Sequence, residues 1–226
     1  MNVVRNDDHT ATELKRYLVV LDVDSTLIEN EVIELLAAEA GSLELVSAVT
    51  ERAMRGELDF SESLRERVAT LAGLPVTVFE TVRSQIQVTQ GVPELIAAVH
   101  DAGGKVAVVS GGFHELLDPL ALELGLDKWR ANRLEVLDGV LTGKVLGDIV
   151  DAQAKADSLI AWAAEFDIPI DDTVAIGDGA NDLIMMTAAG LGVAFCAKPI
   201  VQDQADVALN DRDLSLALTL IGLRTS

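Results

Sequence analysis

The feature that most constrains the fold of this chain is a series of short apolar runs rich in Val, Ile and Leu, separated by longer segments with helical periodicity. The runs that we predict as strands are "YLVVLDV" from Tyr17, "KVAVVSG" from Lys105, "TVAIGDG" from Thr173 and "LGVAF" from Leu191. Strands that are apolar along their whole length are typical of parallel sheets, because helices cover both faces of such sheets. We therefore predict an α/β fold, a Rossmann-like doubly wound parallel sheet.

The segment between the first two predicted strands is too long for a single crossover connection. Residues 30–90 contain three stretches with helical periodicity and no convincing strand. We interpret them as an inserted helical cap, and residues 1–29 and 91–226 as the two parts of the core, with residues 1–14 forming a loose tail. The alternating segment "NRLEVLDGVLTGKVLG" contains Asp138 followed by Gly139, which predicts a β-hairpin.

Composition narrows the class of protein. The 226 residues are 50% hydrophobic, which suffices for the core of one domain, or of one domain that carries a smaller insertion. The 37 acidic and 17 basic residues give a net charge of -20, which disfavours binding to nucleic acid or to an anionic membrane surface. A single cysteine, Cys196, allows no internal disulfide, and no apolar run has the length of a signal peptide or membrane span. We expect a soluble cytoplasmic protein.

Two aspartates follow the first predicted strand, in "LDVDST". In extended backbone Asp22 and Asp24 point to the same side, so their carboxylates face one small region. Two such charges about 4 Å apart would repel by roughly 4 kcal/mol at an effective dielectric constant near 20. The pair therefore favours a bound metal, a proton on one member, or both. The alternative is a turn in which these residues only cap the next helix.

Polar residues also follow two other predicted strands. The second strand ends at Ser110, and the two glycines after it let backbone amides approach an anion closely. The third ends in "GDGAND", where Asp178, Asn181 and Asp182 offer oxygen ligands to a hard cation. Lys155 lies near the start of the helix that precedes this strand. Taken singly, these segments also fit a glycine turn, a solvated loop with a helix cap, and a surface lysine. Because the carboxyl ends of parallel strands meet at one edge, together they favour a single site.

These segments resemble a known family. "DVDST", "SGG", the lysine in "AKAD" and "GDGAND" resemble the four motifs of the haloacid dehalogenase superfamily of phosphatases. "DVDSTLIENEVIELLAAEAG", "AMRGELDFSESLRERV" and "VVSGGF" resemble the branch of this superfamily that hydrolyses O-phosphoserine. The resemblance runs from about Tyr17 to the last helix. It implies a Rossmann-like core with a helical cap, Mg²⁺ as cofactor, and hydrolysis of O-phospho-L-serine to serine and phosphate, the last step of serine biosynthesis.

Within this resemblance, the core residues have distinct expected roles. Asp22 would be the nucleophile that forms an aspartyl phosphate, and Asp24 would be the general acid and base. Mg²⁺ would bind to Asp22, to Asp178 and to the backbone carbonyl of Asp24. The residues expected to bind the phosphoryl group are Ser110, Gly111 and Lys155. Lys155 would also keep Asp22 ionised. Asn181 is expected to bind substrate and, with Asp182, to support the metal site and Lys155 from behind.

Four residues of the cap segment would recognise the rest of the substrate. The resemblance implies that Glu31 binds the ammonium group, that Arg67 binds the carboxylate, and that Met54 and Phe60 form apolar contacts. Their positions alone also fit a helix-end charge, a solvated helix residue and two core side chains of the cap. The expected roles of these four residues therefore rest on the resemblance of the motifs and not on the spacing of the residues.

Two other functions compete with this hypothesis. The chain could be a related phosphatase or phosphotransferase that acts on another small phosphomonoester, which differs only in what Glu31 and Arg67 contact. It could instead be a non-catalytic signalling module in which Asp22 is phosphorylated and a partner protein binds the phosphorylated form. A signalling module has little use for a helical cap or for a general acid at Asp24, so this hypothesis fits the sequence least well.

Overall fold

The computed structural model describes residues 15–55 and 57–224 of the chain. Within these residues seven strands form one sheet in the order β4-β3-β2-β1-β5-β6-β7. The strands are β1 (Leu18–Leu21), β2 (Lys105–Phe113), β3 (Lys128–Leu137), β4 (Val140–Leu146), β5 (Thr173–Gly177), β6 (Leu191–Phe195) and β7 (Val207–Leu209). The four strands expected from the apolar runs correspond to β1, β2, β5 and β6, and the prediction of an α/β fold is confirmed.

All but one of the strand pairings are parallel. β1 lies between β2 and β5, and β6 and β7 extend the sheet beyond β5. β3 pairs in parallel with β2 and then turns back into antiparallel β4, which confirms the hairpin. At the hairpin tip both Asp138 and Gly139 have positive φ, 51° and 79°, as a tight two-residue hairpin turn requires.

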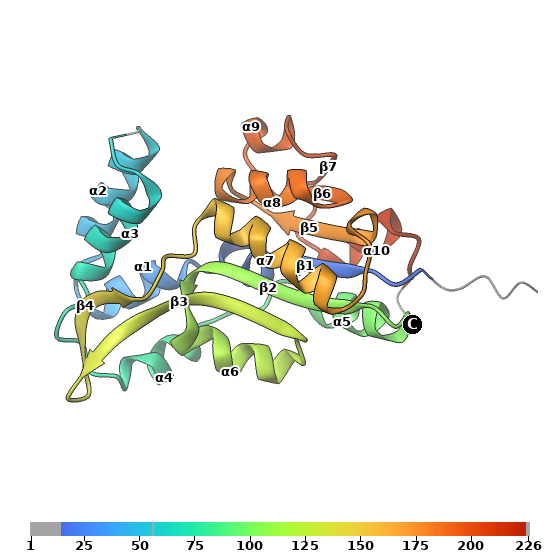
Figure 1. The fold of residues 1–226 in the computed structure, drawn as a ribbon. Helices are drawn as coiled ribbons and strands as arrows, with labels where there is room; N and C mark the ends of the chain where they lie inside the picture. The colour runs from blue at the N-terminus through green and yellow to red at the C-terminus, as the bar shows by residue number, and fades with distance from the viewer. Residues whose placement is uncertain (1–14, 56, 225–226) are drawn as a thin grey trace, which may run out of the picture.

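Helices cover both faces of the sheet (Figure 1). The helices of the core segments are α5 (Val92–Asp101), α6 (His114–Leu124), α7 (Ala152–Glu165), α8 (Leu183–Ala188), α9 (Pro199–Gln202) and α10 (Ala217–Leu220). Side chains of β1 alternate between two buried clusters: Val19 and Leu21 pack with α5 and α6, whereas Leu18 and Val20 pack with α7 and α8. Burial on both sides explains why the strand is apolar at every position.

In the described part of the chain, four further α-helices lie between β1 and α5. They are α1 (Val32–Glu39), α2 (Leu43–Met54), α3 (Phe60–Ala69) and α4 (Val78–Arg83). Figure 1 shows α1, α2 and α3 gathered beyond the ends of β1 and β2, on the same side of the view as the tip of the β3–β4 hairpin. Helix α3 begins at a capping box, in which the Asp59 side chain accepts from the Glu62 backbone and the Glu62 side chain accepts from the Asp59 backbone. The division at residues 30–90 into core and cap stays a prediction.

Short helical turns complete the described backbone. They are η1 (Val23–Leu27), η2 (Ile170–Asp172), η3 (Ala180–Asp182) and η4 (Leu214–Leu216). The predicted tail at residues 1–14 lies outside the described residues. Over residues 15–55 and 57–224, no helix combines the length and the apolar character needed to cross a membrane.

Candidate active site

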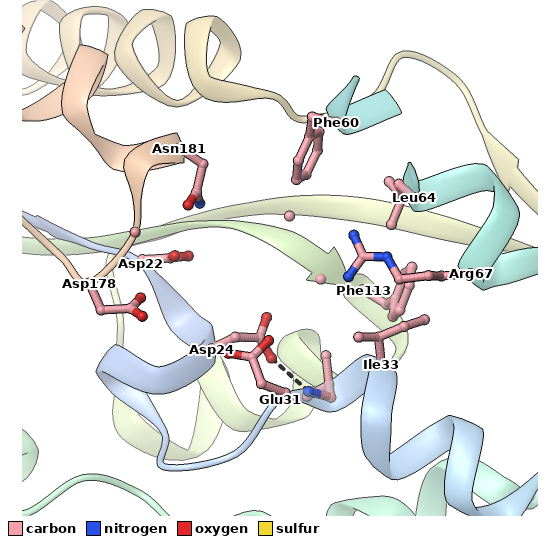
Figure 2. A pocket seen from close by; sticks show the side chains of 14 residues that line it. Asp22, Asp24, Glu31, Ile33, Phe60, Leu64, Arg67, Phe113, Asp178 and Asn181 are labelled. Carbon is pink, nitrogen blue, oxygen red and sulfur yellow. Dashed lines mark hydrogen bonds between the residues drawn. The ribbon is translucent and has the colours of Figure 1, made fainter. Parts of the chain in front are cut away.

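A cavity of about 200 Å³ lies where β1, β2 and β5 end, facing α1 and α3 (Figure 2). Its polar lining includes Asp22, Asp24, Glu31, Arg67, Asp178 and Asn181. Figure 2 shows the carboxylates of Asp22, Asp24 and Asp178 on one side and the Arg67 guanidinium entering from α3. Most of the residues singled out in the sequence therefore line one cavity, although they come from segments far apart in the chain.

Asp22 is held in place by a buried cation. Its backbone amide donates to the Ile176 carbonyl at 2.9 Å, which attaches the end of β1 to β5. Lys155, 1% exposed, places its Nζ 2.8 Å from Asp22 Oδ1 and 2.7 Å from Asp182 Oδ1. Burial alone would lower the pKa of Lys155, but the two carboxylates raise it, so the ammonium stays charged. The ion pair thus holds the Asp22 side chain in one orientation.

Asp24 lies in surroundings that favour its neutral form. Burial, followed by the charge of Glu31, raises its pKa to about 8. The Val32 backbone amide donates to Asp24 Oδ1 at 2.7 Å, and the Ser110 hydroxyl lies 3.4 Å from Oδ2. A carboxyl group that is protonated near neutral pH, held by two neighbours and facing a cavity, is suited to donate a proton there. The neighbours of Asp24 therefore suit it to proton transfer, whereas Asp22 is paired with the Lys155 ammonium.

Carboxylate oxygens crowd together beside Asp22. One oxygen each of Asp22, Asp178 and Asp182 lies within 4.8 Å of the others. Burial and the charge of Asp22 raise the pKa of Asp178 to about 6 and that of Asp182 to about 7. Asp182 already accepts from Lys155 and from the Gly179 amide, whereas Asp178 accepts a long 3.4 Å bond from the Thr26 hydroxyl. The oxygens of Asp22 and Asp178 therefore fit a hard divalent cation such as Mg²⁺, with Asp182 behind them.

The end of β2 forms a tight glycine segment beside Asp24. The Gly112 amide donates to Ser110 Oγ at 2.7 Å, and Ser110 itself is buried behind the cavity wall. A Cβ atom on Gly111 would lie 2.9 Å from the Phe60 ring, and one on Gly112 would lie 2.9 Å from Asp24 Oδ2. Only glycine allows the backbone to pass this close to both groups. The segment leaves room for an anion between β2 and α3.

Opposite charges face the cavity from α1 and α3. Glu31 precedes α1 and accepts a 2.6 Å hydrogen bond from the Ser25 hydroxyl, and burial raises its pKa. Arg67 lies on α3, where burial lowers its pKa and its Nε donates to the Ser63 carbonyl at 3.3 Å. Phe60 lies on the same helix and lines the same cavity. Met54 is the last residue of α2, but its side chain lies outside the part of the chain that the structure describes, and its role stays a prediction.

The structure brings further residues to the site that the sequence analysis did not identify. Ser25 orients Glu31 and has a positive φ of 57°, and Thr26, fully buried, contacts Asp178. Both lie inside "DVDST", so the motif contains them without showing their contacts. Leu64 lines the cavity beside Phe60 and Arg67, and helical spacing could have revealed it because the three lie on one face of α3.

Comparisons with known proteins agree with this geometry. A family model described as haloacid dehalogenase-like hydrolase matches residues 19–187. The phosphoserine phosphatase of Streptococcus thermophilus is 53% identical over 90% of this chain and 95% of its own length. Phosphoserine phosphatase SerB2 of Mycobacterium tuberculosis is 50% identical over 99% of this chain, which spans only 54% of that protein. The chain therefore belongs to the haloacid dehalogenase-like hydrolases and, within them, to the phosphoserine phosphatase family.

Solved structures lead to the same relatives. A substrate-bound phosphoserine phosphatase complex superimposes with a TM-score of 0.86 at 45% identity, over 91% of this chain and 98% of the other. A phospho-aspartyl intermediate analogue of phosphoserine phosphatase superimposes with a TM-score of 0.85, also at 45% identity, over 91% and 99%. The resemblance expected from the four motifs is confirmed at the level of sequence and of fold.

Proposed function

We propose that this chain hydrolyses O-phospho-L-serine to L-serine and phosphate, the last step of serine biosynthesis, with Mg²⁺ as cofactor. The observation that carries the proposal is that one cavity contains a carboxylate pair, Asp22 and Asp24, beside an opposed pair of charges, Glu31 and Arg67. The first pair suits transfer of a phosphoryl group, and the second suits the ammonium and carboxylate groups of an amino acid.

The reaction proceeds in two steps on Asp22. A carboxylate oxygen of Asp22 attacks phosphorus, a new P–O bond forms, and the bond from phosphorus to the serine oxygen breaks. Asp24 donates its proton to the departing serine oxygen, which leaves as a hydroxyl. Asp24 then accepts a proton from the water that attacks phosphorus. The bond from phosphorus to the Asp22 oxygen breaks, which regenerates the Asp22 carboxylate and releases inorganic phosphate. The raised pKa of Asp24 supports this exchange of roles.

Positive charge has to offset the anions that meet in this cavity. Lys155 lies 2.8 Å from Asp22 and supplies one such charge from behind. Mg²⁺ bound by Asp22, Asp178 and the backbone carbonyl of Asp24 would supply further charge to the phosphoryl oxygens. The Gly111 amide at the cavity wall and the Ser110 hydroxyl buried behind it would bind phosphoryl oxygens, together with Asn181, which also lines the cavity. These groups act on any phosphomonoester, so the choice of phosphoserine depends on Glu31 and Arg67.

A substrate panel tests the proposal directly. We expect Mg²⁺-dependent phosphate release from L-phosphoserine, slower release from phosphothreonine, and little release from sugar phosphates that lack the amino-acid charges. Equal rates on all of these substrates would instead point to a general phosphomonoesterase. If no substrate is hydrolysed and acetyl phosphate only labels Asp22, the chain acts as a signalling module.

Replacing Arg67 should change specificity more than chemistry. We expect Arg67→Ala to lower kcat/KM for phosphoserine by about 10- to 100-fold, because a charged hydrogen bond is worth roughly 1.5–3 kcal/mol. Phosphate release from a substrate without a carboxylate should change little. The matched control is Arg65→Ala on the same helix, because Arg65 lies outside the lining of this cavity. Equal losses in both variants, or on both substrates, would contradict the assignment.

Removing the metal should stop turnover reversibly. We expect chelation with EDTA to abolish phosphate release and added Mg²⁺ to restore it, because an anionic nucleophile attacks an anionic phosphate. Asp178→Asn should raise the Mg²⁺ concentration needed for half-maximal activity by about tenfold or more. Asp171→Asn, at an exposed carboxylate, is the control. Turnover that survives complete chelation would contradict the metal assignment, as would an unchanged Mg²⁺ requirement in Asp178→Asn.

A further inference from the structure

A buried asparagine outside the four motifs connects two segments of the active site. Asn132 lies in β3 and is 1% exposed. Its Nδ2 donates to the Gly111 carbonyl at 2.8 Å, and its Oδ1 accepts from the Val150 amide at 2.8 Å. A carbonyl can only accept and an amide N–H can only donate, so these partners define which way the side-chain amide points.

The first of these bonds sets the orientation of residues 110–112 at the end of β2, the segment expected to bind phosphate, which we call the phosphate segment. Pairing between β2 and β3 is irregular from Val109 to Phe113, and the Asn132 side chain supplies the hydrogen bond that the Gly111 carbonyl accepts there. In a trans peptide the carbonyl and the following N–H point in opposite directions, so a held Gly111 carbonyl directs the Gly112 amide the other way. That amide donates to Ser110 Oγ at 2.7 Å, which leaves the hydroxyl proton free for Asp24 or for a phosphoryl oxygen.

The second bond sets the start of α7. Val150, also 1% exposed, directly precedes Asp151, whose side chain caps α7 by accepting from the Ala154 amide at 2.9 Å. Lys155 lies in the first turn of this helix, and its amide donates to the Asp151 carbonyl at 3.0 Å. A shift of Val150 would therefore move the base of the lysine that pairs with Asp22.

We propose that Asn132 is a positioning residue. It holds the phosphate segment at Gly111 and the start of α7, which carries Lys155, in fixed positions relative to each other. This inference rests on the proposed function, because it assigns Asn132 to the same phosphoryl-transfer site. Asn132 touches neither substrate nor the reacting atoms. It acts through Ser110 on one side and Lys155 on the other. A displacement of about 1 Å in such groups is enough to lower a rate by about a hundredfold.

The test compares Asn132→Leu, which keeps the approximate side-chain volume, with Leu134→Ala, which removes a buried side chain from the same strand. We expect Asn132→Leu to lower kcat for phosphoserine by about 10- to 100-fold and to weaken inhibition by inorganic phosphate by about tenfold. Leu134→Ala should lower the unfolding temperature but keep both kinetic values within about twofold at a temperature where it is folded. If Asn132→Leu does not fold, Asn132→Asp, with nearly the same shape, takes its place.

Two outcomes would overturn the inference. One is wild-type kcat and phosphate inhibition in the Asn132 variant, and the other is an equal kinetic loss in Leu134→Ala. If the wild-type chain itself releases no phosphate from phosphoserine, the proposed function fails. Binding of inorganic phosphate, measured by calorimetry, then tests Asn132 separately: weaker binding in Asn132→Leu alone supports the inference, and equal binding to the wild type contradicts it.

Discussion

Asp22→Asn is expected to lower phosphate release from phosphoserine by about 10⁴-fold or more, because an amide cannot take the place of the attacking carboxylate. Asparagine has nearly the same shape as Asp22, which lies 2.8 Å from the Lys155 ammonium, and Asp182 still pairs with this lysine, so the fold should survive. Acid quenching followed by mass spectrometry should detect an aspartyl phosphate in the wild type and none in the variant. The loss of both turnover and the covalent intermediate would identify Asp22 as the nucleophile.

The control for this experiment is Asp101→Asn, which removes an exposed carboxylate at the end of α5. It should release phosphate at the wild-type rate, since it changes the net charge equally without touching the cavity. An Asp22→Asn variant that keeps more than about a tenth of the wild-type rate would contradict a covalent mechanism through this residue. A phosphorylated peptide that does not contain Asp22 would contradict it as well.

Lys155→Met is expected to reduce both stability and activity. The substitution removes the buried cation between Asp22 and Asp182 and leaves two carboxylates that are 5% and 0% exposed without compensation. Removing one partner of a buried ion pair commonly costs about 3–5 kcal/mol of unfolding free energy. Phosphate release should fall by about a hundredfold or more, because Asp22 loses its orienting charge and the phosphoryl oxygens lose a nearby cation. Urea unfolding and phosphate release, measured at one temperature, check both effects.

Lys105→Met provides a matched comparison for this prediction. Lys105 pairs with Asp127 at 2.7 Å, but its side chain is 40% exposed. An ion pair in such a position is worth about 1 kcal/mol or less. Lys105 is not among the residues that line the cavity. We expect full activity and a small loss of stability in this variant. Equal losses of stability in the two variants would contradict the special role of burial at Lys155.

The strands that the sequence predicts are those with apolar side chains on both faces. β1, β2, β5 and β6 lie in the middle of the sheet, and continuous Val, Ile and Leu runs mark them. β7, at one edge, has three partly exposed residues and carries no such run. β3 changes partner along its length, from parallel pairing with β2 to antiparallel pairing with β4. Only its hairpin half has a signal in the sequence, since alternation and a turn dipeptide are local features.

Prediction of the candidate site from the sequence is limited in a similar way. The motif residues Asp22, Asp24 and Asp178 could be predicted because they follow apolar strands whose ends meet at one edge of a parallel sheet. Asn132 could not be predicted, because its side chain bonds only to backbone atoms of Gly111 and Val150. A hydrogen bond to a backbone atom does not depend on the residue type of the partner, so the sequence does not reveal it. The same reason hides the contact between the Val32 amide and Asp24.

The sequence by itself determined where the central strands and the helical segments form and which side chains carry reactive groups, because periodicity and strand-end residues are local properties of the chain. The tertiary structure decided which of these groups interact. Lys155 meets Asp22 and Asp182 only because α7 packs beside β5 and β2. Burial beside Glu31, and not residue type, raises the pKa of Asp24 to about 8 and separates its role from that of Asp22. Distances and solvent exposure arise from packing of remote segments, and these quantities control the chemistry of the site.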